Sequence, residues 1–257
     1  MGWIRQPYKP GSIPIDVQST PSLTKTDTPG AALEDLQIVT YQDSIIRGKT
    51  VLPALALSNY RSKILSRNMT SWYFNDKVCR GISNETGKFV LAHLRAPQYI
   101  PIYVYEENED VWVSGNVIKR GMWEIELVVK IQGILAEDLD TTFIDIGANV
   151  GVYALTAAKL GCKVVAIDAF EGNIARLCKS IEAGNLTRNI VLIHNAVSNT
   201  REKVAIEVGK RNIGGTYVRK INQTFQDRYV VNSILLDDLL EVLIPSKGRH
   251  KDGRRNI

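Results

Sequence analysis

The sequence predicts an α/β fold built on a doubly wound parallel sheet, with a small β-rich segment before it. Short apolar runs alternate with helical patterns between residues 142 and 197, which is the order that a parallel sheet with crossover helices requires. The runs are continuously apolar rather than alternating, as is typical of strands whose two faces are both covered. One run ends in the glycine-rich turn DIGANVG at 145–151, where we expect a strand to pass into a helix.

The N-terminal part of the chain is less regular. Residues 1–30 hold five of the nine prolines and show no apolar period, so a disordered arm is expected there. Residues 31–120 form an extension that is ambiguous over 31–80, with helical features around 51–66. Strands of a small antiparallel unit are predicted at 88–94, 100–107 and 110–118, because short β-rich runs are broken there by Pro, Asn and Gly.

The elements of the predicted sheet follow in order. A helix from about Glu124 to Glu137 carries its apolar residues on one face at helical spacing. After it the sequence predicts strands at 142–147, 163–168 and 189–197, with helices at 152–160 and 171–184 between them. Further strands are expected at 203–208 and 228–234, and a short helix at 235–243. The main domain is thus predicted to cover 121–243, and a basic tail, 244–257, follows it.

The net charge of +5 is concentrated at the C-terminus. Residues 246–257 carry five basic residues against Asp252, a net +4. Such a tail can bind nucleic acid or anionic lipid, but a solvated chain end is the simpler interpretation. No other feature of the sequence indicates nucleic-acid binding.

Cysteine usage and hydropathy bear on the compartment. The three cysteines are widely spaced, without a CxxC pair or a metal-binding spacing, and are predicted to be structural or incidental thiols: Cys79, Cys162 and Cys178. No apolar run has the length of a transmembrane helix, and no signal peptide is recognisable. This favours the cytoplasm, with the secretory pathway as the alternative. Four Asn-x-Thr sequons matter only in that alternative: Asn68, Asn84, Asn185 and Asn222.

The glycine-rich turn predicts a ligand site. Gly147 and Gly151 bracket the turn, and glycine allows both a positive φ and the close approach of a ligand. The turn follows the carboxyl end of a strand, where open parallel sheets place their ligands. A second strand ends in Asp168, whose carboxylate can accept both hydroxyls of a ribose. A nucleoside-containing ligand across two neighbouring strand ends is therefore expected.

Two cofactor classes use this geometry. Dinucleotide folds carry G-x-G-x-x-G and place a pyrophosphate at the helix N-terminus, whereas this chain has G-x-x-x-G with Asp145 two positions before the first glycine. A carboxylate there repels a pyrophosphate and suits an amino-bearing ligand, such as the methionine part of S-adenosylmethionine. A nicotinamide-dependent oxidoreductase that binds NAD remains an alternative, as does a turn that holds no ligand.

Six stretches are similar to motifs of one known family: GMWEIELVVKI, FIDIGANVGVYAL, VVAIDAFEGNIARL, IVLIHNAVSN, RNIGGT and SILLDDLL. Through them, the segment 121–240 resembles the FkbM family of S-adenosylmethionine-dependent methyltransferases, of which the D-x-G-A-N-x-G form of the first motif is distinctive. The resemblance implies a Rossmann-like class I methyltransferase sheet, of which this chain supplies a part. It also implies methyl transfer to an oxygen or nitrogen of a small-molecule or glycan-type acceptor.

The resemblance also implies a set of site residues. Four would line the methionine and ribose side of the cofactor: Asp145, Gly147, Asn149 and Gly151. Asp168 would bind the ribose hydroxyls, and Asn195 and Ala196 would face the adenine. Glu124 would touch the cofactor, while Gly214, Gly215 and Thr216 would lie near the substrate. No catalytic residue is nominated, because no His–Asp or Cys–His pair stands out and His194 is expected to be structural.

The chain also departs from the family. After the second acidic strand end the family has E-P-x-P-x-N, whereas this chain reads DAFEGN, which keeps Asn173 and loses both prolines. The family continues with more strands after LLDDLLEVL, which implies a C-terminally truncated form that has lost its activity with the missing half. The strand of Asp145 would then be an apolar edge, which 230–234 could cover. A non-catalytic binding module acting through the basic tail is the remaining alternative.

Overall fold

The computed structural model describes residues 64–80, 88–95, 99–221 and 228–243, together with the backbone of 38–39 and 45–46. All of them belong to the compact unit Ala32–Ile257. The predicted arm at 1–30, the helical features over 51–63 and the basic tail at 244–257 lie outside the described residues.

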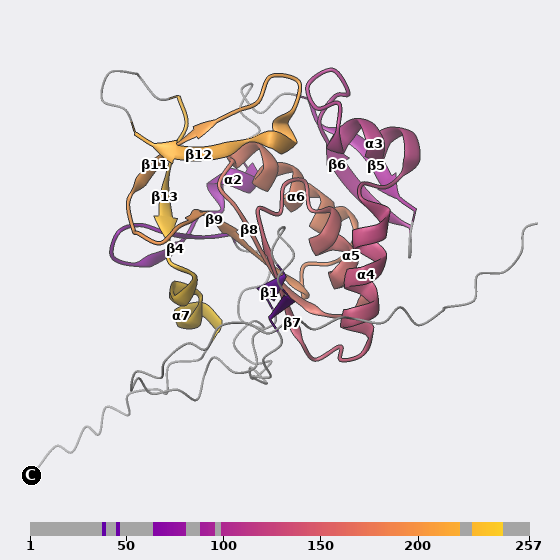
Figure 1. Cartoon of the computed structure of the whole chain (residues 1–257), viewed down its shortest axis with the longest axis horizontal. Coiled ribbons are helices and arrows are strands. Elements are labelled where there is room, and N and C mark those ends of the chain that lie inside the picture. The colour runs from indigo at the N-terminus through magenta and orange to yellow at the C-terminus, as the bar shows by residue number, and fades with distance from the viewer. Residues whose placement is uncertain are drawn as a thin grey trace, which may run out of the picture. The chain divides into compact units, whose positions relative to one another are not determined.

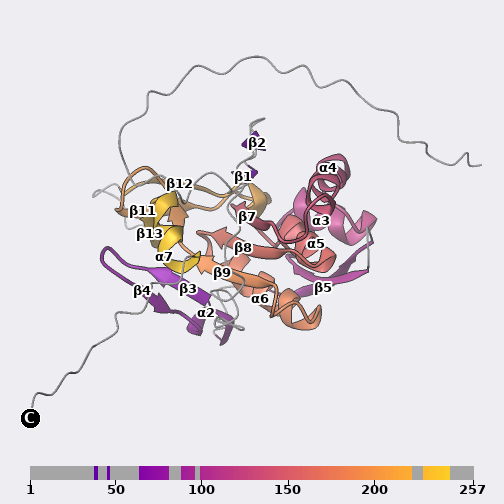
Figure 2. The same cartoon turned by 90° about the horizontal axis from the view of Figure 1, so that it is seen from below.

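A central sheet in the order β2-β1-β7-β8-β9-β3-β4 organises the fold (Figures 1 and 2). Five strands in its middle are parallel: β1 (Ile38–Val39), β7 (Thr142–Ile146), β8 (Lys163–Asp168), β9 (Ile190–His194) and β3 (Ile64–Arg67). The two outer strands, β2 (Ile45–Ile46) and β4 (Trp72–Phe74), are antiparallel to their neighbours. The α/β class and the three predicted strands at its centre are confirmed.

Each face of this sheet has its own apolar core. In β8, Val164 and Ala166 pack with α5 (Val152–Leu160) and α6 (Glu171–Ala183), whereas Val165 and Ile167 face a second cluster. The short helices η2 (Leu236–Leu239) and α7 (Leu240–Leu243) contribute to that second cluster. The strands are apolar throughout because both of their faces are covered.

Further elements stack on the helical face. Helix α4 (Ile125–Ala136) packs against α5, and the hairpin of β5 (Val90–Leu94) and β6 (Ile100–Val104) packs against α6 (Figure 1). The helix predicted over 124–137 and the two antiparallel strands predicted near 88–107 are therefore confirmed.

A smaller sheet continues from the end of β9. Its order is β10 (Ala196–Val197), β13 (Val230–Ile234), β11 (Lys203–Glu207) and β12 (Tyr217–Lys220). The strands predicted at 203–208 and 228–234 are confirmed. The predicted strand at 189–197 is interrupted, because Asn195 separates β9 from β10.

Two expectations from the sequence are wrong. Residues 110–118 do not form a third strand, because Val113–Arg120 is the helix α3. Buried Asp110, which precedes that helix, accepts hydrogen bonds from the backbone N–H and the hydroxyl of Ser114 in its first turn. Nor is β7 a bare edge, since β1 pairs with it in parallel, while 230–234 pairs with β10 and β11 instead.

Two of the three cysteines differ from the prediction of structural or incidental thiols. Cys79, on the short helix α2 (Lys77–Arg80), forms a disulfide with Cys178 on α6, with a Cα–Cα distance of 5.9 Å. Cys162 is free and buried, and burial raises the pKa of its thiol. The disulfide links the β3–β4–α2 segment covalently to the main helical layer.

Candidate functional site

A cleft lies where β7, β8 and β9 end. It consists of two adjoining cavities of about 580 and 370 Å³, a size that suits a drug-sized ligand or a nucleoside cofactor. Both cavities are lined by Ile146, Gly147, Asn149 and Gly214. The cleft therefore runs from the glycine-rich turn across to the end of β8, the position where a ligand is expected from the sequence.

The backbone of the turn is held by β8. Gly147, Asn149 and Gly151 all have positive φ, at 76°, 52° and 95°. The N–H groups of Gly147 and Ala148 both donate to the carbonyl oxygen of Ile167 at 2.9 Å. The N–H of Asn149 donates to the Asp168 carboxylate at 2.8 Å. These bonds fix the turn relative to the end of the neighbouring strand.

The two glycines of the turn serve different needs. A Cβ built on Gly147 would meet nothing within 4 Å, and Gly147 lines both cavities. A Cβ on Gly151 would lie 2.2 Å from Cδ1 of Leu177 in α6, and Gly151 does not line the cleft. Gly147 thus leaves space for a ligand, whereas Gly151 lets the start of α5 approach α6.

Asp168 is buried and already has several partners. Its carboxylate accepts hydrogen bonds from the N–H of Asn149 and the N–H of Phe170, each at 2.8 Å, and from the side-chain amide of Asn173 at 3.2 Å. Burial raises the pKa of Asp168, and these hydrogen bonds oppose that shift. An ionised carboxylate has about four lone-pair positions. One position is left, so Asp168 can accept one further donor rather than the two expected for a ribose.

Asp145 lies in β7, directly before the residues that line the cleft. It is buried, and within the described part of the chain its Oδ2 has no hydrogen-bond partner. Burial raises its pKa to about 7, the N–H of Ala154 opposes the shift, and the nearby charge of Asp168 adds to it. The carboxyl group is therefore poised to gain charge if a cationic or donor group approaches.

This shift predicts a pH dependence of stability. The carboxyl of Asp145 has a pKa of about 7 in the folded chain against 3.8 when unperturbed. The folded state therefore holds a proton that the unfolded state has lost, so the free energy of unfolding declines as pH rises from about 4 to 7. We expect Asp145→Asn to raise the free energy of unfolding above pH 7 by roughly 1–4 kcal/mol.

Urea denaturation of the ligand-free chain across this pH range measures the effect. Some decline will remain in the variant, because the pKa of Asp168 is raised as well. If the free energy of unfolding changed with pH in the same way in the variant and the parent, the Asp145 carboxyl would not be held in its neutral form.

Asn195 and Ala196 lie at the far end of the cleft, lining the smaller cavity. The side chain of Asn195 is fully engaged with backbone groups of other strands. Its oxygen accepts from the N–H of Arg67 at 2.7 Å, and its amide donates to the carbonyl oxygens of Arg67 and Asn232 at 2.8 and 2.9 Å. The side chain of Asn195 thus joins β9 to β3 and β13, and it leaves Ala196 as the nearer candidate for contact with a flat ring.

The loop 212–216 forms the other wall of the cleft. Its η1 turn (Ile213–Gly215) is held by the N–H of Gly215, which donates to the side-chain oxygen of Asn212 at 3.1 Å. A Cβ on Gly214 would lie 2.6 Å from Val113 and 3.0 Å from the Asn149 amide. The loop therefore packs directly on the glycine-rich turn, and the structure places Gly214, Gly215 and Thr216 at the cleft.

Three buried polar atoms around the cleft lack partners among the described residues: Oδ2 of Asp145, Oδ1 of Asn149 and the hydroxyl of Thr216. Asn149 and Thr216 line the cavities themselves. Buried polar groups are rarely left unpaired in native proteins. These three atoms are available for hydrogen bonds at the cleft.

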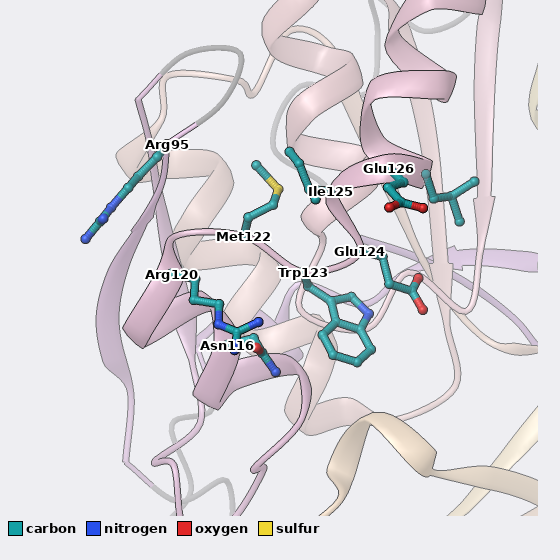
Figure 3. Close-up of a pocket in the computed structure, with 9 residues that line it drawn as sticks. Arg95, Asn116, Arg120, Met122, Trp123, Glu124, Ile125 and Glu126 are labelled. Carbon is teal, nitrogen blue, oxygen red and sulfur yellow. The ribbon is translucent and has the colours of Figure 1, made fainter. Parts of the chain in front are cut away.

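Glu124 lies outside this cleft. It occupies the N-terminal position of α4 with a φ of 46°, and its carboxylate accepts a hydrogen bond from the Tyr153 hydroxyl. It lines a separate cavity of about 850 Å³, drawn in Figure 3. Trp123 lines both that cavity and the 580 Å³ part of the cleft, so the two spaces are neighbours.

Sequence reasoning missed several residues of the cleft: Trp112, Trp123, Tyr153, Phe170 and Asn212. In the structure Trp112 is 58% exposed, and large exposed apolar side chains often mark binding surfaces, but this exposure could not be read from the sequence. His194 was expected to be structural, and its ring nitrogen is bonded to the carbonyl oxygen of Ala169 at 3.0 Å. The described residues contain no cluster of side chains that could hold a metal ion, and no helix among them could span a membrane.

Comparison of the chain with protein-family models, with curated proteins and with solved structures finds no match.

Proposed function

We propose that the cleft binds S-adenosylmethionine and that the chain acts as a methyltransferase with a Rossmann-like sheet. The observation that carries this proposal is the open space at Gly147 beside the end of β8, where Asp168 keeps one acceptor position. A nucleoside cofactor fits the space at Gly147 and the acceptor position of Asp168. Its ribose would lie near Asp168, and the rest of the cofactor would lie over the glycine-rich turn. The resemblance of 121–240 to the FkbM family agrees with this arrangement.

The unpartnered polar atoms favour an amino-bearing cofactor. Oδ2 of Asp145 and Oδ1 of Asn149 are acceptors without donors among the described residues. An ammonium group supplies donors, and its charge would draw the buried Asp145 carboxyl toward its ionised form. A pyrophosphate supplies only acceptors and would leave these atoms unpaired.

The cofactor, when bound, would supply an activated methyl group on a sulfonium. The chain's own residues would hold and orient it: the turn 147–151 by its backbone, Asp168 by its carboxylate and the loop 212–216 by covering the cleft. Methyl transfer depends mainly on alignment of the two reactants. We therefore assign no catalytic base.

We also propose that the acceptor enters from the cavity of Figure 3. Trp123 lines both this cavity and the cleft. Arg120 and Asn116, which also line the cavity, lie side by side in it (Figure 3). A polar small molecule or a glycan suits a cavity with these donors. The second wall near the reacting methyl would be Gly214, Gly215 and Thr216.

Titration calorimetry tests the cofactor. We expect S-adenosylmethionine to bind the full chain and Asp168→Asn to bind it about tenfold or more weakly, because a charged acceptor is lost. The variant will also be less stable, since Asp168 accepts three hydrogen bonds within the chain, so its folded fraction must be measured first.

NAD is the matched control ligand. Below pH 7, S-adenosylmethionine should release protons on binding, because a cationic group lowers the pKa of Asp145. Calorimetric titrations in buffers of different ionisation enthalpy measure the number of protons released on binding. Binding of NAD in preference to S-adenosylmethionine would favour the oxidoreductase, and binding of neither would favour a module without this cofactor. Methyl transfer to a mixture of small molecules and glycans is then measured with labelled cofactor.

We further propose that the compartment is the secretory pathway rather than the cytoplasm. The Cys79–Cys178 disulfide carries this proposal, because disulfides persist in oxidising compartments and are rare in the cytosol.

A further inference from the structure

Two of the four sequons lie within the described residues, and both present an exposed asparagine. Asn68 is in the turn between β3 and β4, and Asn185 follows the end of α6. An N-linked glycan is bulky and is carried only where the asparagine faces solvent. Both positions meet that condition.

The turn at Asn68 holds its side chain in a defined orientation. Its Oδ1 accepts hydrogen bonds from the N–H of Thr70 at 2.9 Å, the hydroxyl of Thr70 at 3.0 Å and the N–H of Ser71 at 2.8 Å. No acceptor among the described residues takes the amide nitrogen of Asn68. The nitrogen that would carry a glycan is therefore free, while the sequon's own hydroxyl is bonded to the same amide group.

Asn185 is presented in a different way. It has a φ of 55° just beyond α6, where its backbone N–H donates to the carbonyl of Glu182 at 3.1 Å. No hydrogen bond within the described residues engages its side chain. It precedes β9, so it lies at the end of the sheet opposite the cleft, whereas Asn68 follows β3, two strands from β8. A glycan on Asn185 would leave the cleft accessible, whereas Asn68 lies at the same edge of the sheet as the cleft, next to Arg67, which is hydrogen-bonded to Asn195.

The disulfide is an independent observation that points to the same chemistry. Cys79 and Cys178 are joined with a Cα–Cα distance of 5.9 Å, within the range that a disulfide requires. The oxidising compartment in which disulfides form is also where Asn-x-Thr sequons are glycosylated. The disulfide and glycosylation of the sequons therefore require the same oxidising compartment.

We propose that Asn68 and Asn185 are N-glycosylation sites. In this reaction the amide nitrogen forms a bond to the anomeric carbon of a lipid-linked oligosaccharide. The bond from that carbon to the diphosphate breaks, the lipid diphosphate leaves with the electron pair, and the amide loses one proton. The inference does not depend on the proposed cofactor.

The test is glycosidase treatment of the full chain made in eukaryotic cells from its own coding sequence. The parent should gain mobility after an amidase that removes N-glycans. Thr70→Ala and Thr187→Ala should each lose one glycan, and the double variant should lose both. Thr70→Ser and Thr187→Ser keep each sequon and are the matched controls, so they should retain the glycans. Neither alanine variant alters an asparagine, and the N–H bonds of the Asn68 turn remain.

A parent unaffected by the amidase would overturn the proposal, as would alanine variants that carry the parent's number of glycans. Thiol labelling of the unfolded, unreduced chain checks the disulfide separately. One of the three cysteines should react before reduction and all three after it. Three reactive thiols before reduction would remove the disulfide as support for this assignment.

Discussion

Gly147→Val should abolish measurable binding of S-adenosylmethionine. Gly147 has a φ of 76°, lines both cavities of the cleft and has open space where a Cβ would stand. A branched side chain would fill the space proposed for the cofactor. It would also strain the backbone by about 1–2 kcal/mol, because L-residues with a side chain avoid the left-handed region. Calorimetry and urea denaturation measure the two effects separately.

Gly161→Val is the matched control for this substitution. Gly161 ends α5 with a φ of 108°, and its Cβ too would meet nothing within 4 Å. It does not line the cleft. We expect a similar loss of stability and unchanged cofactor binding. If both variants bound with the parent's affinity, the cofactor would have to lie elsewhere.

Gly151→Ala should destabilise the chain by about 2–5 kcal/mol, the sum of left-handed strain and overpacking. Its φ is 95°, and a Cβ would lie 2.2 Å from Cδ1 of Leu177, which is fully buried in α6. Leu177 would have to shift within the core between α5 and α6 to make room for the Cβ. Chemical denaturation measures the loss.

Two further variants make that result specific. Gly133→Ala, in α4, has no atom within 4 Å of its new Cβ and an ordinary φ, so it should stabilise the chain by up to about 1 kcal/mol. Combining Gly151→Ala with Leu177→Ala should cost less than the sum of the two single changes, because the clash is then removed. Strict additivity would contradict the packing explanation.

The centre of the sheet could be predicted because its signal is local. Residues 142–194 carry continuous apolar strands, two helical stripes and a glycine turn, and each of these elements appears in the structure. The strands that flank this centre could not be predicted, because β1 and β3 are short and their pairing partners are distant in sequence. The run 110–118 was misassigned since its valines and Trp112 favour a strand, whereas the buried contact of Asp110 with Ser114 decides for a helix.

In the candidate site, too, local features could be predicted from the sequence and long-range contacts could not. The position of the cleft followed from the glycine turn and the end of β8, because parallel strands end at one edge of a sheet. The sequence could not show that a side chain would find open space at Gly147 but would clash at Gly151. That difference arises because Leu177 lies against only Gly151 in the folded chain. The disulfide was missed for a similar reason, because 99 positions separate Cys79 from Cys178.

The parallel pairing of β1 with β7 and of β3 with β9 has a consequence for biosynthesis. Both N-terminal strands leave the ribosome before the strands that they pair with, and the contact of Arg67 with Asn195 spans 128 positions. Such long-range pairing slows folding, because a large loop must close before the contact is formed. β3 can therefore pair early with β4, which follows it closely in the chain, but its parallel edge stays open until β9 has been translated. A chain that stopped before residue 190 would leave one edge of β3 without its parallel neighbour, while β4 would still pair with the other edge.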